Sequence, residues 1–136
     1  MPMAKPTLQL ETDRLTLVPF QLDAIEALLA GDAARLRTLT GLGFPEPLTP
    51  PPLLQDVLAH VRDQLRASPD SLGWWTWLTV ERSTRRVTGA TGFGGPPDAE
   101  GAVMIGYATY PGADHRGFAS EATEALVQWA LQQPGV

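Results

Sequence analysis

The chain of 136 residues contains no cysteine and only one lysine, Lys5. The absence of cysteine excludes disulfides, thiol nucleophiles and cysteine-ligated metals. The two histidines, His60 and His115, lie far apart and have no carboxylates at ligand spacing, so no metal site is expected. The formal net charge is −5 and most arginines are scattered. This argues against a nucleic-acid or anionic-membrane partner, because both require clustered cations.

Long hydrophobic runs are also missing. The first six residues, MPMAKP, contain no segment typical of a signal peptide, and no later run approaches the length of a transmembrane helix. We therefore expect a cytoplasmic protein without a membrane partner. Hydrophobic residues make up 43% of the chain and charged residues 18%. This composition and length predict one packed domain over residues 1–136.

The hydrophobic pattern predicts elements in the order β-α-α-β-β-β-α. Alternation of apolar and polar residues predicts strands over residues 8–20, 74–81, 86–93 and 102–110. Helical spacing predicts two short helices between residues 25 and 39, a longer one from about Leu54 to Arg66, and a last one after Arg116. This order predicts an α+β (α/β) fold with a mixed, mainly antiparallel sheet and flanking helices.

A glycine run in the third predicted strand resembles a nucleotide site. Gly89, Gly92 and Gly95 have the spacing G-x-x-G-x-x-G, which is typical of dinucleotide-binding enzymes. That site needs a helix directly after the glycines, whose N-terminus faces the diphosphate. Pro96 and Pro97 follow here instead. The sequence therefore predicts a strand that ends in a glycine-rich turn.

The segment between the last predicted strand and the last helix has the composition of a diphosphate site. Successive backbone N–H groups at such a turn attract an anion, and the helix N-terminus adds its partial positive charge. The small residues Gly117, Ala119 and Ser120 let a diphosphate approach the main chain, and Arg116 can donate a charge-assisted hydrogen bond. An ordinary helix start would have a similar composition, so the loop alone leaves both interpretations open.

Several motifs around this segment resemble the GNAT family of acyl-CoA N-acyltransferases, in particular its RimJ/RimL-like branch. The matching segments are LETDRL at 10–15, IGY at 105–107, GFASEA at 117–122 and WA at 129–130. The resemblance implies an acetyl-CoA-dependent N-acetyltransferase that uses no metal. Such an enzyme moves the acetyl group to a primary amine, of a protein N-terminus or a small molecule, by direct attack.

The resemblance also implies roles for individual residues. A backbone N–H near Ala108 or Thr109 would stabilise the oxyanion. Trp75 and Trp77, which are expected to share one strand face, would line the acceptor cleft or fill the core. The acyl donor would be bound by Tyr107, Ala108, Thr109, Asp114, His115, Arg116, Gly117, Phe118, Ala119 and Ser120. The general base and acid stay unassigned; the candidates are Glu81, Asp98 and Glu100 as bases, and Tyr107 and Tyr110 as acids.

Departures from the family pattern favour a second interpretation, in which the chain is a catalytically weak or inactive GNAT-like module that binds CoA or a protein. Asp114 stands where the family has Arg or Gln, His115 replaces the first motif glycine, and Met104 replaces a frequent glutamate. Relatives also continue beyond the last helix. The chain thus resembles the N-terminal three-quarters of the usual GNAT fold and is expected to be C-terminally incomplete. We expect a second copy or a partner protein to cover the edge of its last strand.

Overall fold

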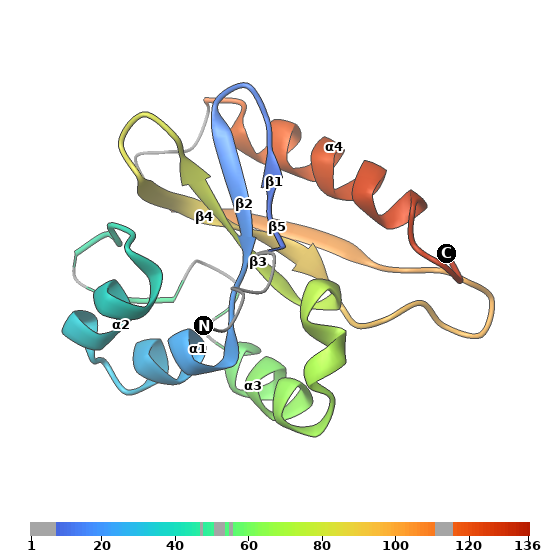
Figure 1. Ribbon diagram of the computed structural model, residues 1–136, viewed down its shortest axis with the longest axis horizontal. Helices are drawn as coiled ribbons and strands as arrows, with labels where there is room; N and C mark the ends of the chain where they lie inside the picture. Colours follow the sequence, from blue (N-terminus) through green and yellow to red (C-terminus); the bar gives the residue numbers. More distant parts are fainter. Residues whose placement is uncertain (1–7, 47, 51–53, 55, 111–115) are drawn as a thin grey trace, which may run out of the picture.

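The computed structural model describes residues 8–46, 48–50, 54, 56–110 and 116–136. They form a five-stranded antiparallel sheet in the order β1-β2-β3-β4-β5, with helices on both faces (Figure 1). The strands are β1 (Leu10–Glu11), β2 (Leu15–Pro19), β3 (Thr76–Glu81), β4 (Arg86–Phe93) and β5 (Ile105–Thr109). The helices are α1 (Leu22–Leu29), α2 (Ala33–Thr40), α3 (Leu58–Ala67), the 3-10 helix η1 (Pro69–Trp74) and α4 (Phe118–Leu131). The predicted fold class is confirmed.

Two predicted boundaries are wrong. The predicted strand over residues 8–20 is a hairpin of β1 and β2, because Thr12 closes a turn by donating its backbone N–H to the Leu15 carbonyl at 2.9 Å. The predicted helix from Leu54 begins only at Leu58, and Val57, placed on its apolar stripe, is 42% exposed. In the first case a polar turn interrupts a pattern that looks continuous in the sequence, and in the second a turn at residues 56–57 precedes the helix.

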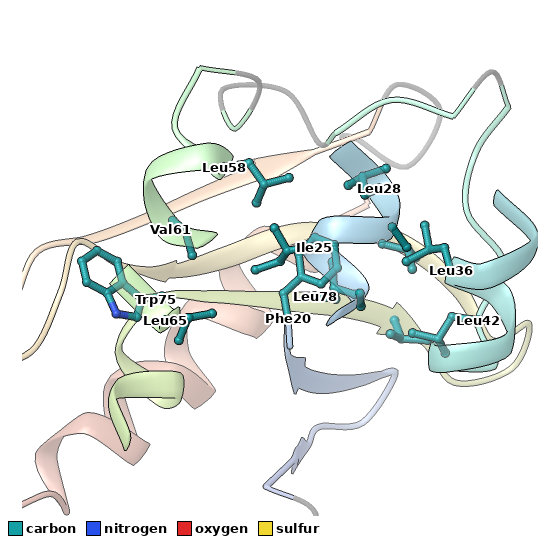
Figure 2. Packing of buried hydrophobic residues seen from close by; sticks show 14 of the residues in the cluster. Phe20, Ile25, Leu28, Leu36, Leu42, Leu58, Val61, Leu65, Trp75 and Leu78 are labelled. Atoms are coloured by element: carbon teal, nitrogen blue, oxygen red, sulfur yellow. The ribbon is translucent and has the colours of Figure 1, made fainter. Parts of the chain in front are cut away.

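Helices α1, α2 and α3 cover one face of the sheet. Their buried side chains include Ile25, Leu36 and Leu58, and they pack against Leu78 of β3 (Figure 2). Burial of each such side chain contributes about 1.5–3 kcal/mol to stability. The α1–α3 face is therefore held together by apolar contacts between successive helices and the central strands.

Helix α4 covers the opposite face (Figure 1). Ala122, Leu126 and Ala130 form its buried stripe and pack against Leu15 and Leu17 of β2, among others. The alanines let the helix approach the strands closely. This packing places the N-terminus of α4 beside the turn between β1 and β2.

Trp75 and Trp77 do not share a face, contrary to the prediction. Trp75 packs with the α1–α3 core and Trp77 with the α4 core. The backbone explains the difference, because Trp75 ends η1 with ψ at −128°, outside the strand region, and β3 begins only at Thr76. The alternation of side chains along a strand therefore does not extend back to Trp75.

The glycine run is a strand with a turn at its end, as predicted. A Cβ atom at Gly89 would collide with the carbonyl oxygen of Ala108, and one at Gly92 with that of Trp75. Gly95 has a φ of +124°, which favours glycine in the turn after β4. Close backbone contacts thus account for Gly89 and Gly92, and the positive φ accounts for Gly95.

Among the described residues, no helix is long and apolar enough to cross a membrane.

Candidate functional site

The outer edge of β5 is the first part of the candidate site. Within the described residues β5 pairs only with β4. Tyr110 donates its N–H to the Thr88 carbonyl at 2.8 Å, and Met104 accepts from the Gly94 N–H at 3.0 Å. Backbone groups alternate in direction along an antiparallel strand, so the even-numbered residues between them face β4. The N–H and C=O groups of Ile105, Tyr107 and Thr109 consequently face the open edge.

This alternation separates the two residues predicted for the oxyanion contact. Ala108 lies opposite Ala90, and its N–H is directed to β4, whereas the N–H of Thr109 is directed outward. Tyr107, also predicted to lie at the donor site, has 60% of its surface exposed. Thr109 is therefore the available donor of the pair.

A cavity of about 200 Å³ adjoins β5 on the α1–α3 face of the sheet. Small residues of β4 and β5, including Ala90, Gly106 and Ala108, line it together with Trp75. The Trp75 indole N–H donates to the Ser71 hydroxyl at 2.9 Å, which fixes the ring. Trp77 is fully buried and donates to the Gly73 carbonyl at 2.8 Å. Of the two predicted acceptor-site tryptophans, Trp75 alone borders this cavity.

The N-terminus of α4 is the second part of the site. Gly117 precedes the helix in the left-handed region with a φ of +76°, and no side chain of the described residues caps the first turn. Phe118 is buried in the α4 core, so only its backbone is available to a ligand. Asp114 and His115, predicted to bind the donor, lie outside the described residues. The turn from Gly117 to Ser120 thus offers backbone N–H groups at a positive helix end.

Arg116, the predicted phosphate contact, already has a partner. Its Nη2 lies 2.8 Å from Oε2 of Glu81, and its guanidinium stacks on the Phe118 ring with Cζ 4.5 Å from the centroid. Its side chain remains 48% exposed, and a guanidinium has further N–H groups for an anion. Glu81, a candidate base, is held in this ion pair at the rim of the site.

Arg14, which was not among the predicted site residues, connects the β1–β2 turn to the start of α4. Its Nε donates to Oε1 of Glu121 at 2.8 Å, and its Nη1 donates to the Arg116 carbonyl at 2.7 Å. The backbone N–H of Arg14 and the Thr12 hydroxyl both donate to Oε2 of Glu121. The motifs at 10–15 and 117–122 contain these residues, but neither motif indicates their pairing.

The pKa of Glu121 reflects this network. Partial burial alone would raise the pKa of its carboxyl. The hydrogen bonds from Thr12 and Arg14, together with the positive charge of Arg14, outweigh burial and lower the pKa below its ordinary value. Glu121 therefore stays ionised and continues to hold Arg14 at neutral pH.

The remaining candidates for proton transfer differ in their surroundings. Asp98 accepts the backbone N–H groups of Ala102 and Glu100, and these bonds lower its pKa, which makes it a weaker base. Tyr110 is buried, its hydroxyl donates to the Thr49 carbonyl at 2.7 Å, and burial raises its pKa. Tyr107 is thus the exposed phenol at the β5 edge.

In the part of the chain that the structure describes, no group of three or more acidic or histidine side chains is arranged to hold a metal.

Comparisons with known proteins agree with this geometry. The model of the acetyltransferase (GNAT) domain family matches residues 14–136. The uncharacterized N-acetyltransferase YjdG of Bacillus subtilis is 28% identical over 127 residues, which cover 93% of this chain and 74% of that protein.

Solved acetyltransferase structures share the fold. A proposed ribosomal-protein-serine acetyltransferase from Vibrio cholerae is similar with a TM-score of 0.57 at 18% identity, over 94% of this chain and 69% of that one. A GNAT-family acetyltransferase from Bacillus anthracis is similar with a TM-score of 0.54 at 17% identity, over 91% and 66% of the two chains. At these identities the likeness concerns the fold alone.

Proposed function

The chain belongs to the GNAT acetyltransferase family, whose members are acyltransferases that in general use acetyl-CoA, and from this membership we propose that it acetylates a primary amine. The observation that carries the proposal is the continuity of two features. The open edge of β5 presents outward backbone groups, and the chain then leads to the uncapped N-terminus of α4. An extended ligand with an anionic end fits both.

In this proposal the pantetheine arm of acetyl-CoA lies along β5 and pairs with the outward groups of Ile105, Tyr107 and Thr109. The diphosphate lies at the backbone N–H groups of residues 117–120, and Arg116 extends a guanidinium N–H to it. Asp114 and His115, which lie outside the described residues, are also assigned to the diphosphate in this proposal. A single domain thus supplies both contacts to the donor.

The transfer step needs the acetyl carbonyl to be polarised and the amine to be neutral. We assign the polarising contact to the Thr109 N–H, which is directed to the open edge. The amine attacks the carbonyl carbon, the thiolate leaves, and the amine proton passes to solvent. No carboxylate borders the cavity among the described residues, so deprotonation through water is the simplest route.

The acceptor approaches from the cavity beside Trp75 in this proposal. The cavity wall is largely apolar, which suits the carbon skeleton next to an amine. The name of the Vibrio cholerae neighbour refers to a ribosomal-protein serine, which favours a protein acceptor and the RimJ/RimL-like branch. The net charge of −5 favours a cationic acceptor.

A specific observation favours the second candidate function, a CoA- or protein-binding module with weak or no catalysis. Met104 occupies the position of a frequent family glutamate and is 79% exposed. Tyr107 is 60% exposed as well, so two large side chains at β5 are open to contact by a partner. A second copy or a partner protein that covers this edge would occupy the backbone groups assigned to pantetheine, so it fits the binding module. Sedimentation over a range of concentrations tests for the second copy.

Calorimetric titration with acetyl-CoA tests the proposed function first. Saturable binding with one site is expected. Its absence would contradict the acetyltransferase and the CoA-binding module, and would leave only a protein-binding module. A thiol-release assay over N-terminal peptides and small amines then separates them. Turnover of at least one amine above the rate of acetyl-CoA hydrolysis is the expected result, whereas binding without turnover would favour the binding module.

A further inference from the structure

We propose that Arg14 is a positioning residue for the diphosphate site, because it sets the direction in which the Gly117 N–H points. This inference rests on the proposed function and adds a residue to it. The Nη1 of Arg14 donates to the Arg116 carbonyl oxygen at 2.7 Å. Arg14 belongs to the β1–β2 hairpin and lies 102 positions before Arg116 in the chain. The hydrogen bond therefore fixes the start of α4 from outside the helix.

Because the peptide bond is planar, the hydrogen bond to the Arg116 carbonyl also fixes the direction of the Gly117 N–H. In a trans peptide the C=O and the following N–H point in opposite directions. The carbonyl of Arg116 points toward Arg14, so the N–H of Gly117 points away from it. That N–H adjoins the first turn of α4 and adds to the set that the proposed diphosphate would meet. If the peptide rotated by a half-turn, a carbonyl oxygen would face the anion instead.

Two further contacts hold the Arg14 guanidinium where it can do this. Glu121 accepts its Nε, and the oxygens of Glu121 are themselves fixed by the Thr12 hydroxyl and the Arg14 backbone N–H. The ring of Phe118 lies beneath the guanidinium, with Cζ 4.5 Å from the centroid. The hairpin, the helix and the peptide between Arg116 and Gly117 are thus locked in one arrangement.

The surroundings of Gly117 agree with a fixed peptide. A Cβ atom there would lie 3.3 Å from Nη2 of Arg14, which leaves little room for a side chain on that side. The Arg14 side chain is 46% exposed, so the ion pair with Glu121 itself adds little to stability. The hydrogen bond to the Arg116 carbonyl therefore explains an arginine at this position better than the stability gained from the Glu121 ion pair does.

The test compares Arg14→Gln and Arg14→Lys with Arg66→Gln as the matched control. Arg66 forms an equally short exposed ion pair with Glu26, at 2.7 Å, but it joins α3 to α1 away from the site. Calorimetry gives the dissociation constant for CoA, NMR titration gives that for pantetheine, and thermal unfolding confirms that each variant is folded. Pantetheine has the same arm as CoA and no phosphate.

We expect Arg14→Gln to weaken CoA about 10-fold, the loss that corresponds to one charge-assisted hydrogen bond, and to leave pantetheine unchanged. Arg14→Lys should lie nearer to Arg14→Gln than to the wild type, because one ammonium cannot bind Glu121 and the carbonyl in the same geometry. Arg66→Gln should bind both ligands as the wild type does.

Two results would overturn the inference. Equal loss for CoA and pantetheine would mean that Arg14 only supports the fold, and wild-type affinity in Arg14→Lys would mean that its charge alone matters. If Arg14→Gln does not fold, the CoA and pantetheine dissociation constants of Arg14→Lys are compared with those of the wild type. A loss for CoA alone supports the inference, and an equal loss for both ligands or no loss overturns it. Failure of the proposed function is distinguishable, since the wild-type protein would then not bind CoA at all.

Discussion

Apolar packing holds both faces of the sheet, but charged and polar contacts distinguish the N-terminal end of α4 from the α1–α3 face. On the α1–α3 face, buried aliphatic side chains from three helices pack on the central strands. At the N-terminal end of α4 on the other face, Arg14, Thr12, Arg116 and two glutamates form charged and polar contacts. The hydrophobic effect is non-directional, whereas each hydrogen bond at α4 requires a particular orientation of its two groups. The first region therefore provides stability, and the second provides direction for the backbone groups of the proposed donor site.

The strongest test of this contrast removes a core side chain. Leu36→Ala on α2 deletes a side chain that is 1% exposed, and we expect it to lower the free energy of unfolding by about 2–5 kcal/mol. Affinity of the folded protein for CoA should stay the same, because α2 does not adjoin β5 or α4. Urea unfolding and calorimetry measure the two quantities, and a matching loss of affinity would remove the distinction between the faces.

A bulky residue at the helix start should give the opposite result. Gly117→Leu places a side chain at a φ of +76° and near Arg14, so we expect CoA affinity to fall by about 10-fold or more. The backbone strain costs about 1–3 kcal/mol. Gly31→Leu is the control, since it has a φ of +73° and no described atom within 4 Å of its Cβ position. Equal CoA affinities in the two variants would count against a diphosphate site at Gly117.

The two tyrosines near the end of β5 provide a smaller contrast. Tyr110→Phe removes the hydrogen bond to the Thr49 carbonyl, and we expect a loss of about 1 kcal/mol in stability. Tyr107→Phe should leave stability unchanged, because that side chain is 60% exposed. If Tyr107 protonates the leaving thiolate, its variant loses turnover while Tyr110→Phe keeps it. Denaturation and thiol-release assays distinguish the two.

Acid should weaken the α4 network with little effect on the apolar core. The pKa of Glu121 is lowered in the folded state, so its contribution to stability is present above the ordinary value of 4.5 and is lost as pH falls through the folded pKa. The stability difference between the wild type and Glu121→Gln should therefore shrink as the pH drops below about 4.5. A difference that is constant or grows in acid would contradict the assigned contacts.

The sequence predicted those elements whose pattern is local. The α4 stripe of Ala122, Leu126 and Ala130 and the β3–β4 hairpin follow from spacing alone, and both are confirmed. The β1–β2 turn was missed, because Thr12 and Arg14 also fit the polar positions of one alternating strand. Trp75 was misplaced, because a single irregular ψ turns its side chain to the other face.

The candidate site was predictable to a similar extent. Gly117 and the start of α4 follow from a strand-to-helix turn with small residues, which is a local signal. The role of Arg14 is not local, since its partner Glu121 lies 107 positions away and either residue alone reads as an ordinary surface charge. The directions of the Ala108 and Thr109 amides likewise depend on the register with β4, which spacing within β5 does not give.

The most direct measurement is an amide NMR titration of the labelled protein with CoA. We expect the amide signals of Thr109 and of Gly117 to Ser120 to shift together and to saturate at one dissociation constant, while those of α2 stay in place. Saturable shifts confined to α2 and its neighbours, with unchanged amides at Gly117 and Thr109, would contradict a donor site at β5 and the start of α4.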